Sequence, residues 1–445
     1  QVATALREAI ADGRLAPGTR LPASRELAAD LRVSRGVVVG AYEQLVAEGR
    51  LVTRRGAGTV VAVAATPAAP ATPGPATGLL YGDPGRGAPL RPGVPDLGAF
   101  PRAAWRRAYE SALASATDAD LGYGDPSGAP RLRRELADYL GRVRAARLGA
   151  DDVVVTTGAA QAFVLVAQLL RGRGATAIAL EDPGSPGIRG HLEGVGLQLV
   201  PIPVDAGGLD VHALERSDVA AVLVTPAHQF PTGVVLAPAR RAALVDWARR
   251  FDGLIVEDDY DAEFRYDRDP VGCLQGFAPD VTAYIGSVSK ALAPALRLGW
   301  LAVPPKHLSA ARAAKAAADL GGPVLEHLAF AELLASGGYD RHLRRTRRAQ
   351  RERRDALVEA LAAHLPDARI SGVAAGLHLV VELPDGTDDA ALAARARAVG
   401  LEPLALSATR SGRAGGPGLV LGYAGHPPAR LADAVRRLAD LVAHE

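Results

Sequence analysis

The stretch GSVSKALAPALRLGW, residues 286–300, follows the short apolar run Ala283–Ile285 and brings three kinds of polar side chain into one turn. It supplies a hydroxyl at Ser287, an amine at Lys290 and a guanidinium at Arg297. A lysine amine forms an imine with an aldehyde, which a guanidinium cannot do, while hydroxyl and guanidinium groups bind phosphate. The stretch therefore indicates a site for a phosphorylated aldehyde, and pyridoxal 5'-phosphate is the cofactor that needs this set of groups.

Lysine is rare in this chain, which favours a chemical role for Lys290. Of the 51 basic residues, only Lys290, Lys306 and Lys315 are lysine. Arginine does the ordinary cationic work, so a retained lysine suggests chemistry that a guanidinium cannot perform. We interpret Lys306 and Lys315 as surface residues without such a role.

A second polar stretch, GLIVEDDYDAEFRY at residues 253–266, ends another apolar run. Asp258 can keep a pyridine nitrogen protonated, and the phenol of Tyr260 can bond a ring oxygen. An acidic turn or a metal cluster would give a similar pattern. No set of histidines and cysteines accompanies the carboxylates, so we expect no transition-metal site.

A phosphate cradle is expected at TTGAAQ, residues 156–161, which joins an apolar run to the helical pattern AFVLVAQLL. Small side chains there leave the backbone N–H groups of Ala159 and Ala160 free at a helix N-terminus, where anions bind. Small residues are common at such turns, so this motif supports the cofactor site only together with the other two.

The region from residue 79 onward alternates short apolar runs with helical patterns, which predicts an α/β fold with a mostly parallel sheet. In such sheets ligands bind at the carboxyl ends of the strands, where the polar stretches lie. We assign residues 79–322 to a large cofactor domain and 323–445 to a small C-terminal α/β subdomain. The basic stretch Arg341–Arg354 is read as a solvated helix face rather than a DNA contact. The predicted strands are Val153–Val155, Ala177–Leu180, Val219–Val224, Leu254–Val256 and Ala283–Ile285.

The N-terminal residues 1–62 have a different pattern, that of a winged helix-turn-helix. Ser24 and Ser34 are placed to cap two short helices. Ser34 and Arg35 would begin the recognition helix, and RLVTRRGAGTVVA at residues 50–62 would form a wing carrying Arg54 and Arg55. An ordinary helical bundle with solvated arginines fits the same pattern. The expected shared core is Leu27, Leu31, Val38, Tyr42, Leu45 and Val46.

Composition limits the remaining possibilities. A chain of 445 residues should fold as two or three units, and residues 63–78, rich in Pro, Ala and Thr, read as a linker. The net charge of +2 gives no general affinity for polyanions, so any DNA contact must be local. Cys273 is the only cysteine, and no apolar run reaches the length of a membrane span. We expect a cytoplasmic protein without membrane partners.

The run PGTRLPASRELAADLRVSRGVVVGAYEQLVAEGRL, residues 17–51, resembles the DNA-binding domain of the GntR family. The resemblance extends over nearly all of residues 1–62. It implies DNA contacts from Arg25, Ser34, Arg35 and the wing arginines. Gly36 stands where that family usually has threonine, so one contact is expected to be absent.

The later motifs resemble fold-type I aminotransferases, and with the N-terminal domain the whole chain resembles MocR/GabR-type regulators. RPGVPDLGAFP (91–101), YGDPSGAPRLRREL (123–136), TPAHQFPTG (225–233), VEDDYDAEFRY (256–266) and SKALAPALRLGW (289–300) follow in the expected order. The resemblance implies that Lys290 holds pyridoxal 5'-phosphate covalently while Asp258 and Tyr260 bond its ring. The phosphate would be held by the backbone of Ala159 and Ala160, by Ser287 and Arg297, and by Tyr123 of a partner subunit.

Three positions depart from the aminotransferase pattern. Ser185 replaces the aromatic residue that stacks on the cofactor, Phe230 replaces an asparagine, and Val420 replaces the arginine that grips the substrate carboxylate. These changes predict weak or altered turnover. Arg410 or Arg413 would be left to bind a carboxylate, and His228 and Gln229 to bond the ring oxygen.

Both halves of the chain fit a sensor that acts as a head-to-tail homodimer. A small amino compound would react at the cofactor, and the changed packing would shift two DNA-binding domains on operator half-sites. The alternative is a working aminotransferase with a vestigial DNA-binding domain. A third possibility, a scaffold that binds DNA without cofactor, predicts no cofactor absorbance.

Overall fold

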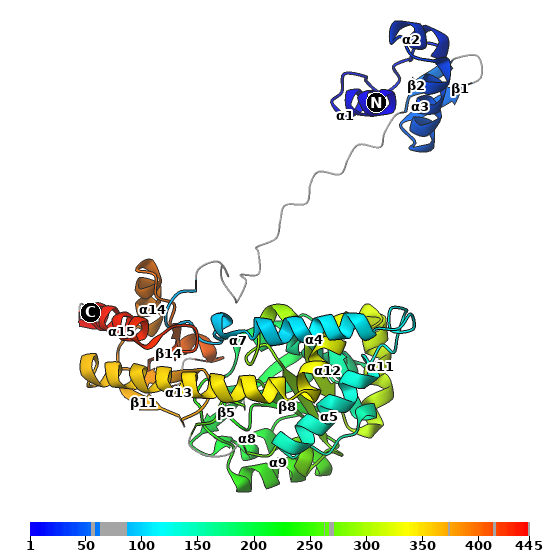
Figure 1. Cartoon of the computed structure of the whole chain (residues 1–445). Helices are drawn as coiled ribbons and strands as arrows, with labels where there is room; N and C mark the ends of the chain where they lie inside the picture. The colour runs from blue at the N-terminus through cyan, green and yellow to red at the C-terminus, as the bar shows by residue number, and fades with distance from the viewer. Residues whose placement is uncertain are drawn as a thin grey trace. The chain divides into compact units, whose positions relative to one another are not determined.

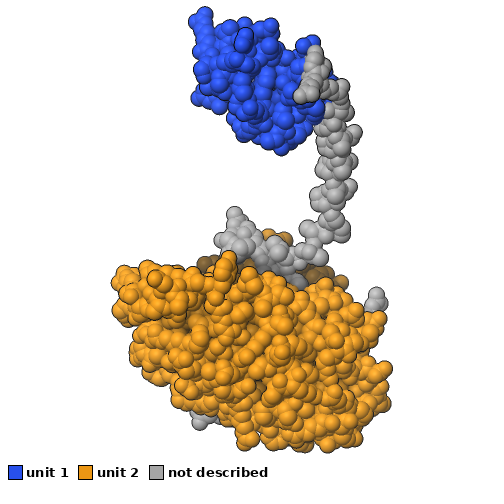
Figure 2. Space-filling model, turned by 90° about the vertical axis from the view of Figure 1, so that its right-hand side faces the viewer, with its two compact units in different colours: residues 1–79 blue, residues 80–445 orange. Residues whose placement is uncertain are grey.

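The computed structural model describes residues 1–54, 58–62, 87–261, 263–266, 271–372, 374–412 and 415–443. The chain divides into two compact units, residues 1–79 and 80–445 (Figure 2). The predicted linker 63–78 lies outside the described residues, as do Arg55 and Arg413. The domain division at residues 62, 78 and 322 stays a prediction.

The first unit is a winged helix-turn-helix, as predicted (Figure 1). The prediction that Ser24 caps a helix is wrong, because the capping position is Ala23, whose N–H donates to the Glu26 carboxylate at 3.2 Å. Ser34 does occupy the N-cap of the third helix, but without a capping hydrogen bond. The elements are α1 (Val2–Ala11), α2 (Ser24–Asp30), α3 (Arg35–Ala47) and the antiparallel pair β1 (Leu51–Arg54) and β2 (Gly58–Val61).

The core of this unit contains Val38, Tyr42 and Leu45, as predicted, and Leu27 packs against it half-buried. Two predicted core residues are instead on the surface, since Leu31 is 47% and Val46 is 38% exposed. The helical spacing fails at these two positions for different reasons. Leu31 follows the last residue of α2, and Val46 is turned away from Leu45 by one helical step of about 100°.

The second unit is built on an eight-stranded sheet with the order β3-β10-β9-β8-β7-β4-β5-β6. Strands β5, β4, β7, β8 and β9 run parallel to one another, whereas β6 is antiparallel to β5, and β10 is antiparallel to β3 and β9. The mostly parallel sheet is therefore confirmed. The bounds are β3 (Val153–Thr156), β4 (Ala177–Asp182), β5 (Gln198–Asp205), β6 (Gly208–Leu209), β7 (Ala221–Val224), β8 (Leu254–Asp259), β9 (Thr282–Ser287) and β10 (Gly299–Ala302).

Helices cover both faces of this sheet because successive strand residues point to opposite sides. Val154 packs with α6 (Ala159–Gly172), α7 (Pro186–Glu193) and α11 (Pro305–Asp319), whereas Val153 and Val155 pack on the other face. That other face is covered by α4 (Arg102–Ser115), α5 (Pro130–Arg144), α8 (Val211–Glu215), α9 (Pro238–Arg250), α10 (Leu274–Phe277) and α12 (Val324–Ala335).

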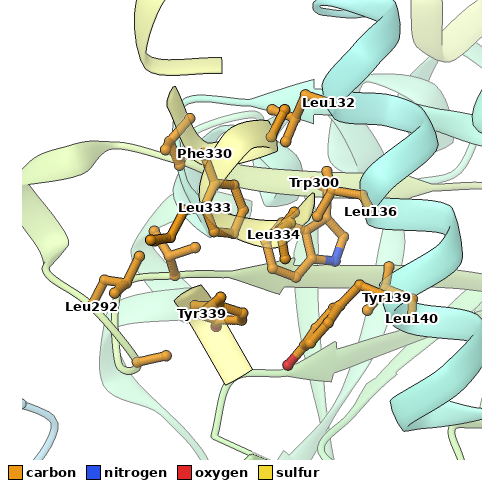
Figure 3. Close-up of a cluster of buried hydrophobic side chains, with 14 of the residues drawn as sticks. Leu132, Leu136, Tyr139, Leu140, Leu292, Trp300, Phe330, Leu333, Leu334 and Tyr339 are labelled. Atoms are coloured by element: carbon orange, nitrogen blue, oxygen red, sulfur yellow. The ribbon is translucent and has the colours of Figure 1, made fainter. Parts of the chain in front are cut away.

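An aromatic cluster fixes the strand that leads to Lys290 (Figure 3). The rings of Trp300 and Phe330 stack with centroids 6.5 Å apart, and Phe330 meets Tyr339 edge-on at 5.4 Å. Leu292, from the turn that carries Lys290, joins the same cluster. The ends of β9 and β10 are thus held by close packing, which gives the site a rigid base.

The lysine prediction was right for Lys306 and wrong for Lys315. Lys306 lies on the surface in an ion pair with Asp252. The side chain of Lys315 is 0% exposed and donates to Asp319 at 2.5 Å. His307, Ala311 and Lys315 are spaced four residues apart, so they share the buried face of α11.

The C-terminal part contains a four-stranded antiparallel sheet with the order β11-β12-β14-β13 and a core of its own. Helix α12 packs against α4 and α5, so it lies with the large sheet although the boundary predicted at residue 323 assigned it to the small subdomain. The elements are α13 (Gly338–His364), β11 (Arg369–Ser371), β12 (His378–Glu382), α14 (Asp389–Ala398), β13 (Leu404–Ala405), β14 (Gly418–Gly422) and α15 (Pro428–Ala443).

The basic stretch Arg341–Arg354 lies on α13 and is only in part a solvated face. Arg341 and Arg348 are exposed, but Arg347 donates to the carbonyl of Glu263 and Arg353 pairs with Asp96 at 2.6 Å. Among the described residues, no helix has the length and apolar character needed to cross a membrane.

Candidate functional site

Lys290 lies in the turn after β9, and its side chain is half-buried. Its Nζ donates to the carbonyl of Gly93 at 2.5 Å, and a Cβ on Gly93 would lie 3.4 Å from the same nitrogen. Burial lowers the pKa of Lys290, while Asp258 and Asp261 raise it and offset part of this effect. A larger neutral fraction makes the amine a better nucleophile.

Asp258 stands near the end of β8, and its side chain is buried. Burial and the neighbouring Asp259 and Asp261 raise its pKa to about 8, against a lowering contribution from Lys290. The carboxyl group therefore holds a proton near neutral pH unless a cation pairs with it. A protonated ring nitrogen is such a cation.

Asp259 faces a different environment from Asp258, because adjacent strand residues point to opposite sides of the sheet. It accepts hydrogen bonds from Arg144 Nε at 2.7 Å and Nη2 at 2.9 Å, and from the hydroxyl of Tyr284. Sequence reasoning missed Arg144, which is 115 residues away along the chain. Arg144 therefore pairs with Asp259 and not with Asp258.

Tyr260 is held by a histidine and an aspartate. Its hydroxyl lies 3.1 Å from Nδ1 of His228, and the same nitrogen lies 2.9 Å from Oδ2 of Asp261. Gly376 packs so closely here that a Cβ on it would lie 2.2 Å from Cε1 of His228. Asp261 was not predicted, although it belongs to the quoted acidic stretch.

The expectation that Gln229 bonds a ring oxygen does not fit its contacts. Its Nε2 donates to Glu181 at 3.3 Å and to the carbonyls of Pro183 and Phe230 at 2.8 and 2.6 Å. Its Oε1 accepts from the N–H and hydroxyl of Thr232. Both ends of this amide are therefore engaged inside the protein, and His228 is the partner of Tyr260.

The predicted anion cradle corresponds to the place where β9 and β3 end beside the start of β10. Ser287 and Thr156 flank Gly299 in register, and α6 begins at Ala159 directly after the β3 turn. Arg297 Nη2 donates to the carbonyl of Thr157 at 2.6 Å. The anion cradle thus comprises the backbone at residues 158–160, Ser287 and Arg297.

Gly158 is required at the N-cap of α6. Its φ of 81° and ψ of 172° belong to a region that is essentially open only to glycine. A Cβ at this position would lie 2.9 Å from Nη2 of Arg297. The missing side chain therefore brings the guanidinium against the helix N-terminus, where the N–H groups of Ala159 and Ala160 favour an anion.

The substrate side of the site lacks the groups of a typical aminotransferase. Val420 is fully buried in β14 and packs with Val380 and Leu406, so it offers no charge. The ring of Phe230 lies 5.0 Å from that of His378, and Ser185 is the N-cap of α7. That these three positions depart from the aminotransferase pattern stays a prediction.

The roles expected of two other residues, Arg410 and Tyr123, stay predictions. Arg410 donates to the carbonyl of Gly416 at 2.8 Å, so its guanidinium is bonded within its own loop. Tyr123 is 96% exposed, between α4 and α5. Its predicted contact with a partner's phosphate stays a prediction.

The first unit presents three of the predicted DNA contacts at the surface. Arg25 in α2, Ser34 at the N-cap of α3 and Arg35 in its first turn are exposed. Within the described residues, neither Arg25 nor Arg35 forms an ion pair. Arg54 ends β1, but its side chain is outside the described part.

Arg20 was not predicted as a DNA contact. Its guanidinium lies 3.2 Å from the position of a Cβ on Gly58, directly beside the β1–β2 hairpin. Arg20 precedes α2 and lies within the quoted GntR-like stretch.

Comparisons with known proteins agree with both halves of this description. Residues 1–61 match the family of bacterial regulatory proteins of the gntR type, and residues 93–438 match aminotransferase class I and II. Kynurenine aminotransferase of Pyrococcus horikoshii superposes with a TM-score of 0.73 at 26% identity, covering 80% of this chain and 90% of that one.

Full-length relatives are transcriptional regulators. The pyridoxine biosynthesis regulator PdxR of Corynebacterium glutamicum is 36% identical over 99% of this chain and 95% of its own length. The probable rhizopine catabolism regulatory protein MocR of Rhizobium meliloti is 32% identical over 97% and 91%. The chain therefore belongs to the MocR family of helix-turn-helix transcriptional regulators, in which a gntR-type domain is fused to an aminotransferase class I and II domain.

Proposed function

We propose that this regulator binds pyridoxal 5'-phosphate on Lys290 and uses it to sense a small amino compound. The observation that supports this most directly is the set of groups at the ends of β8 and β9. A lysine with a lowered pKa, a buried carboxyl group and an anion cradle lie at neighbouring strand ends. Few other cofactors require an amine, an acid and an anion site together.

The residues of the site fit this cofactor group by group. Lys290 would supply the amine that links to the aldehyde, and Asp258 would accept a hydrogen bond from the ring nitrogen. Tyr260, positioned by His228, would donate to the ring oxygen. The anion cradle, with Ala159, Ala160, Ser287 and Arg297, would hold the phosphate. Bound pyridoxal 5'-phosphate supplies an electrophilic carbon and an electron-withdrawing ring.

Burial of the Asp258 carboxyl group would favour its pairing with the ring nitrogen of the cofactor. A pKa of about 8 means that Asp258 is costly to ionise in the cofactor-free protein. A ring nitrogen that shares or donates a proton removes this cost, so cofactor binding and ionisation of Asp258 favour each other.

The substrate side argues for sensing rather than efficient turnover. Val420 provides no cation for a substrate carboxylate, and Arg410 is bonded within its own loop. A ligand amine would therefore be bound mainly through the cofactor. A regulator needs only a ligand that binds one conformation of the protein more tightly than another. It does not need to release a product.

The DNA contacts would come from Arg25, Ser34, Arg35, Arg54 and Arg55 of each gntR-type domain. In a head-to-tail homodimer, two such domains would read two operator half-sites. Tyr123, which is almost fully exposed in the single chain, would complete the phosphate site of the partner subunit.

Absorbance and turnover measurements on one preparation test the proposal. The protein is loaded with pyridoxal 5'-phosphate, and its visible spectrum is compared with those of Lys290→Ala and of the surface control Lys306→Ala. We expect a lysine-dependent band in the native protein and the control that is absent in Lys290→Ala. Sustained conversion of an amino donor, without specific binding to the upstream DNA fragment, would indicate the alternative of a working aminotransferase.

A further inference from the structure

Lys315 is buried and does not belong to the candidate site described above. It is part of a hydrogen-bonded network centred on Asp319, the last residue of α11. Asp319 Oδ1 accepts from Lys315 Nζ at 2.5 Å and from the N–H of Gly321 at 3.0 Å. Its Oδ2 accepts from Nε2 of Gln161 at 2.7 Å. One carboxylate therefore joins α11, the segment after it and the first turn of α6.

Gln161 extends this network to the anion cradle. Its Oε1 accepts the N–H of Thr157 at 2.9 Å, while the carbonyl of Thr157 accepts from Arg297 at 2.6 Å. Both backbone groups of Thr157 are thus held by side chains. The next residue is Gly158, whose backbone conformation begins α6 and aims its first N–H groups.

The charge state of the network favours a fixed geometry. Burial opposes ionisation of Asp319, but the bonds from Lys315 and Gln161 lower its pKa overall. A lysine that is 0% exposed is rarely kept unless it is paired, because burying a charge is costly. A carboxylate held by a buried ammonium cannot turn away from Gln161 without leaving that charge unpaired.

We propose that Asp319, Lys315 and Gln161 are positioning residues for the phosphate of the cofactor. They hold Thr157 so that the N-terminus of α6 and Arg297 converge on one anion. This inference rests on the proposed binding of pyridoxal 5'-phosphate. It adds three residues on two helices that do not themselves touch the ligand.

A pair of ligands that differ only in the phosphate separates this role from a general effect on folding. Dissociation constants for pyridoxal 5'-phosphate and for pyridoxal are measured on cofactor-free native protein, Gln161→Leu and Asp319→Asn. We expect each variant to bind pyridoxal 5'-phosphate roughly tenfold more weakly and pyridoxal within about twofold of native, since one hydrogen bond contributes about that much to the cradle. Lys306→Met, on the surface of the same helix, is the control and should change neither constant.

Gln161→Leu leaves the ion pair of Lys315 and Asp319 intact, so it decides the question if Asp319→Asn fails to fold. Equal losses for both ligands, or no loss of pyridoxal 5'-phosphate affinity, would overturn the positioning role. If native protein binds neither ligand and Lys290→Ala behaves the same, the proposed function itself has failed. The two failures are therefore distinct.

Discussion

The sharpest prediction about the anion cradle concerns Gly158, where alanine should weaken the binding of pyridoxal 5'-phosphate in addition to costing about 1–3 kcal/mol of stability. A Cβ at this position would lie 2.9 Å from Nη2 and 3.1 Å from Cζ of Arg297, so the guanidinium must move. Hydrogen bonds to a charged group contribute about 1.5–3 kcal/mol. Since about 1.4 kcal/mol corresponds to a factor of ten, pyridoxal 5'-phosphate should bind roughly 10- to 150-fold more weakly to Gly158→Ala.

Gly174→Ala is the matched control. Gly174 also has a positive φ, 84°, but a Cβ there would meet nothing within 4 Å. Alanine at such a φ costs about 1–2 kcal/mol of stability, without touching the cradle. Titration of cofactor-free protein, followed by absorbance well below the melting temperature, compares the two variants with native. If Gly158→Ala binds the cofactor within twofold of native, or if both variants weaken binding equally, then displacement of Arg297 by a Cβ at residue 158 does not affect cofactor binding.

Four further predictions concern the ring partner, the pH and the DNA-binding domain. Asp258→Asn should weaken the binding of pyridoxal 5'-phosphate by about 10- to 100-fold in the same titration, since the charged partner of the ring nitrogen is lost. Burial raises the pKa of Asp258 to about 8 and that of Glu181 to about 7, so the folded cofactor-free protein retains protons that the unfolded chain has released. Its stability should therefore fall as the pH rises from about 5 to 8, with a shallower slope in Asp258→Asn, and thermal melts across this range measure both. Gly36→Thr should tighten operator binding in anisotropy titrations, because it supplies the threonine that the GntR resemblance leads us to expect as a DNA contact. The added Cβ fits, since it would meet only Ser34 Oγ, at 4.0 Å. Arg35→Ala should weaken the same binding by roughly tenfold or more, with a shallower salt dependence if the contact is to phosphate; unchanged affinity would remove Arg35 from the interface.

Much of the candidate site could be predicted because its residues follow strand ends. The apolar runs before Asp258 and Ser287 predict neighbouring parallel strands, and β8 and β9 are indeed paired in register. Parallel strands bring their carboxyl ends to one edge of the sheet, so residues far apart in sequence meet there. This is why the sequence could place Asp258 and Lys290 at the same edge of the sheet.

Partners set by tertiary packing were not predictable in the same way. Arg144 reaches Asp259 across 115 positions, and Gln161 reaches Asp319 across 158. The sequence around Arg144 and around Gln161 gives no sign of these distant partners. Lys315 was assigned to the surface because lysine usually lies there, whereas its spacing with Ala311 gives it the buried face of α11.

The errors in the first unit have a local cause. Helical spacing alone does not mark where a helix ends, and Leu31 follows the end of α2, where Arg32 has a φ of 54° and turns the chain. The pattern change at residue 323 marks the start of α12 but not the element against which that helix packs. The change of pattern after Pro323 begins a helix, but that helix packs back on α4 and α5.

If an amine that reacts at Lys290 changes the affinity of the protein for DNA, operator binding should differ with and without that amine. A labelled upstream fragment is titrated with cofactor-loaded native protein and with Lys290→Ala, each with and without a candidate amino compound. We expect an effective amine to shift the operator affinity of the native protein by about 5- to 150-fold, the usual range of coupling between sites, and to leave that of Lys290→Ala unchanged. Equal shifts in both proteins, or cofactor spectra that respond to the amine while DNA affinity stays constant, would contradict this expectation.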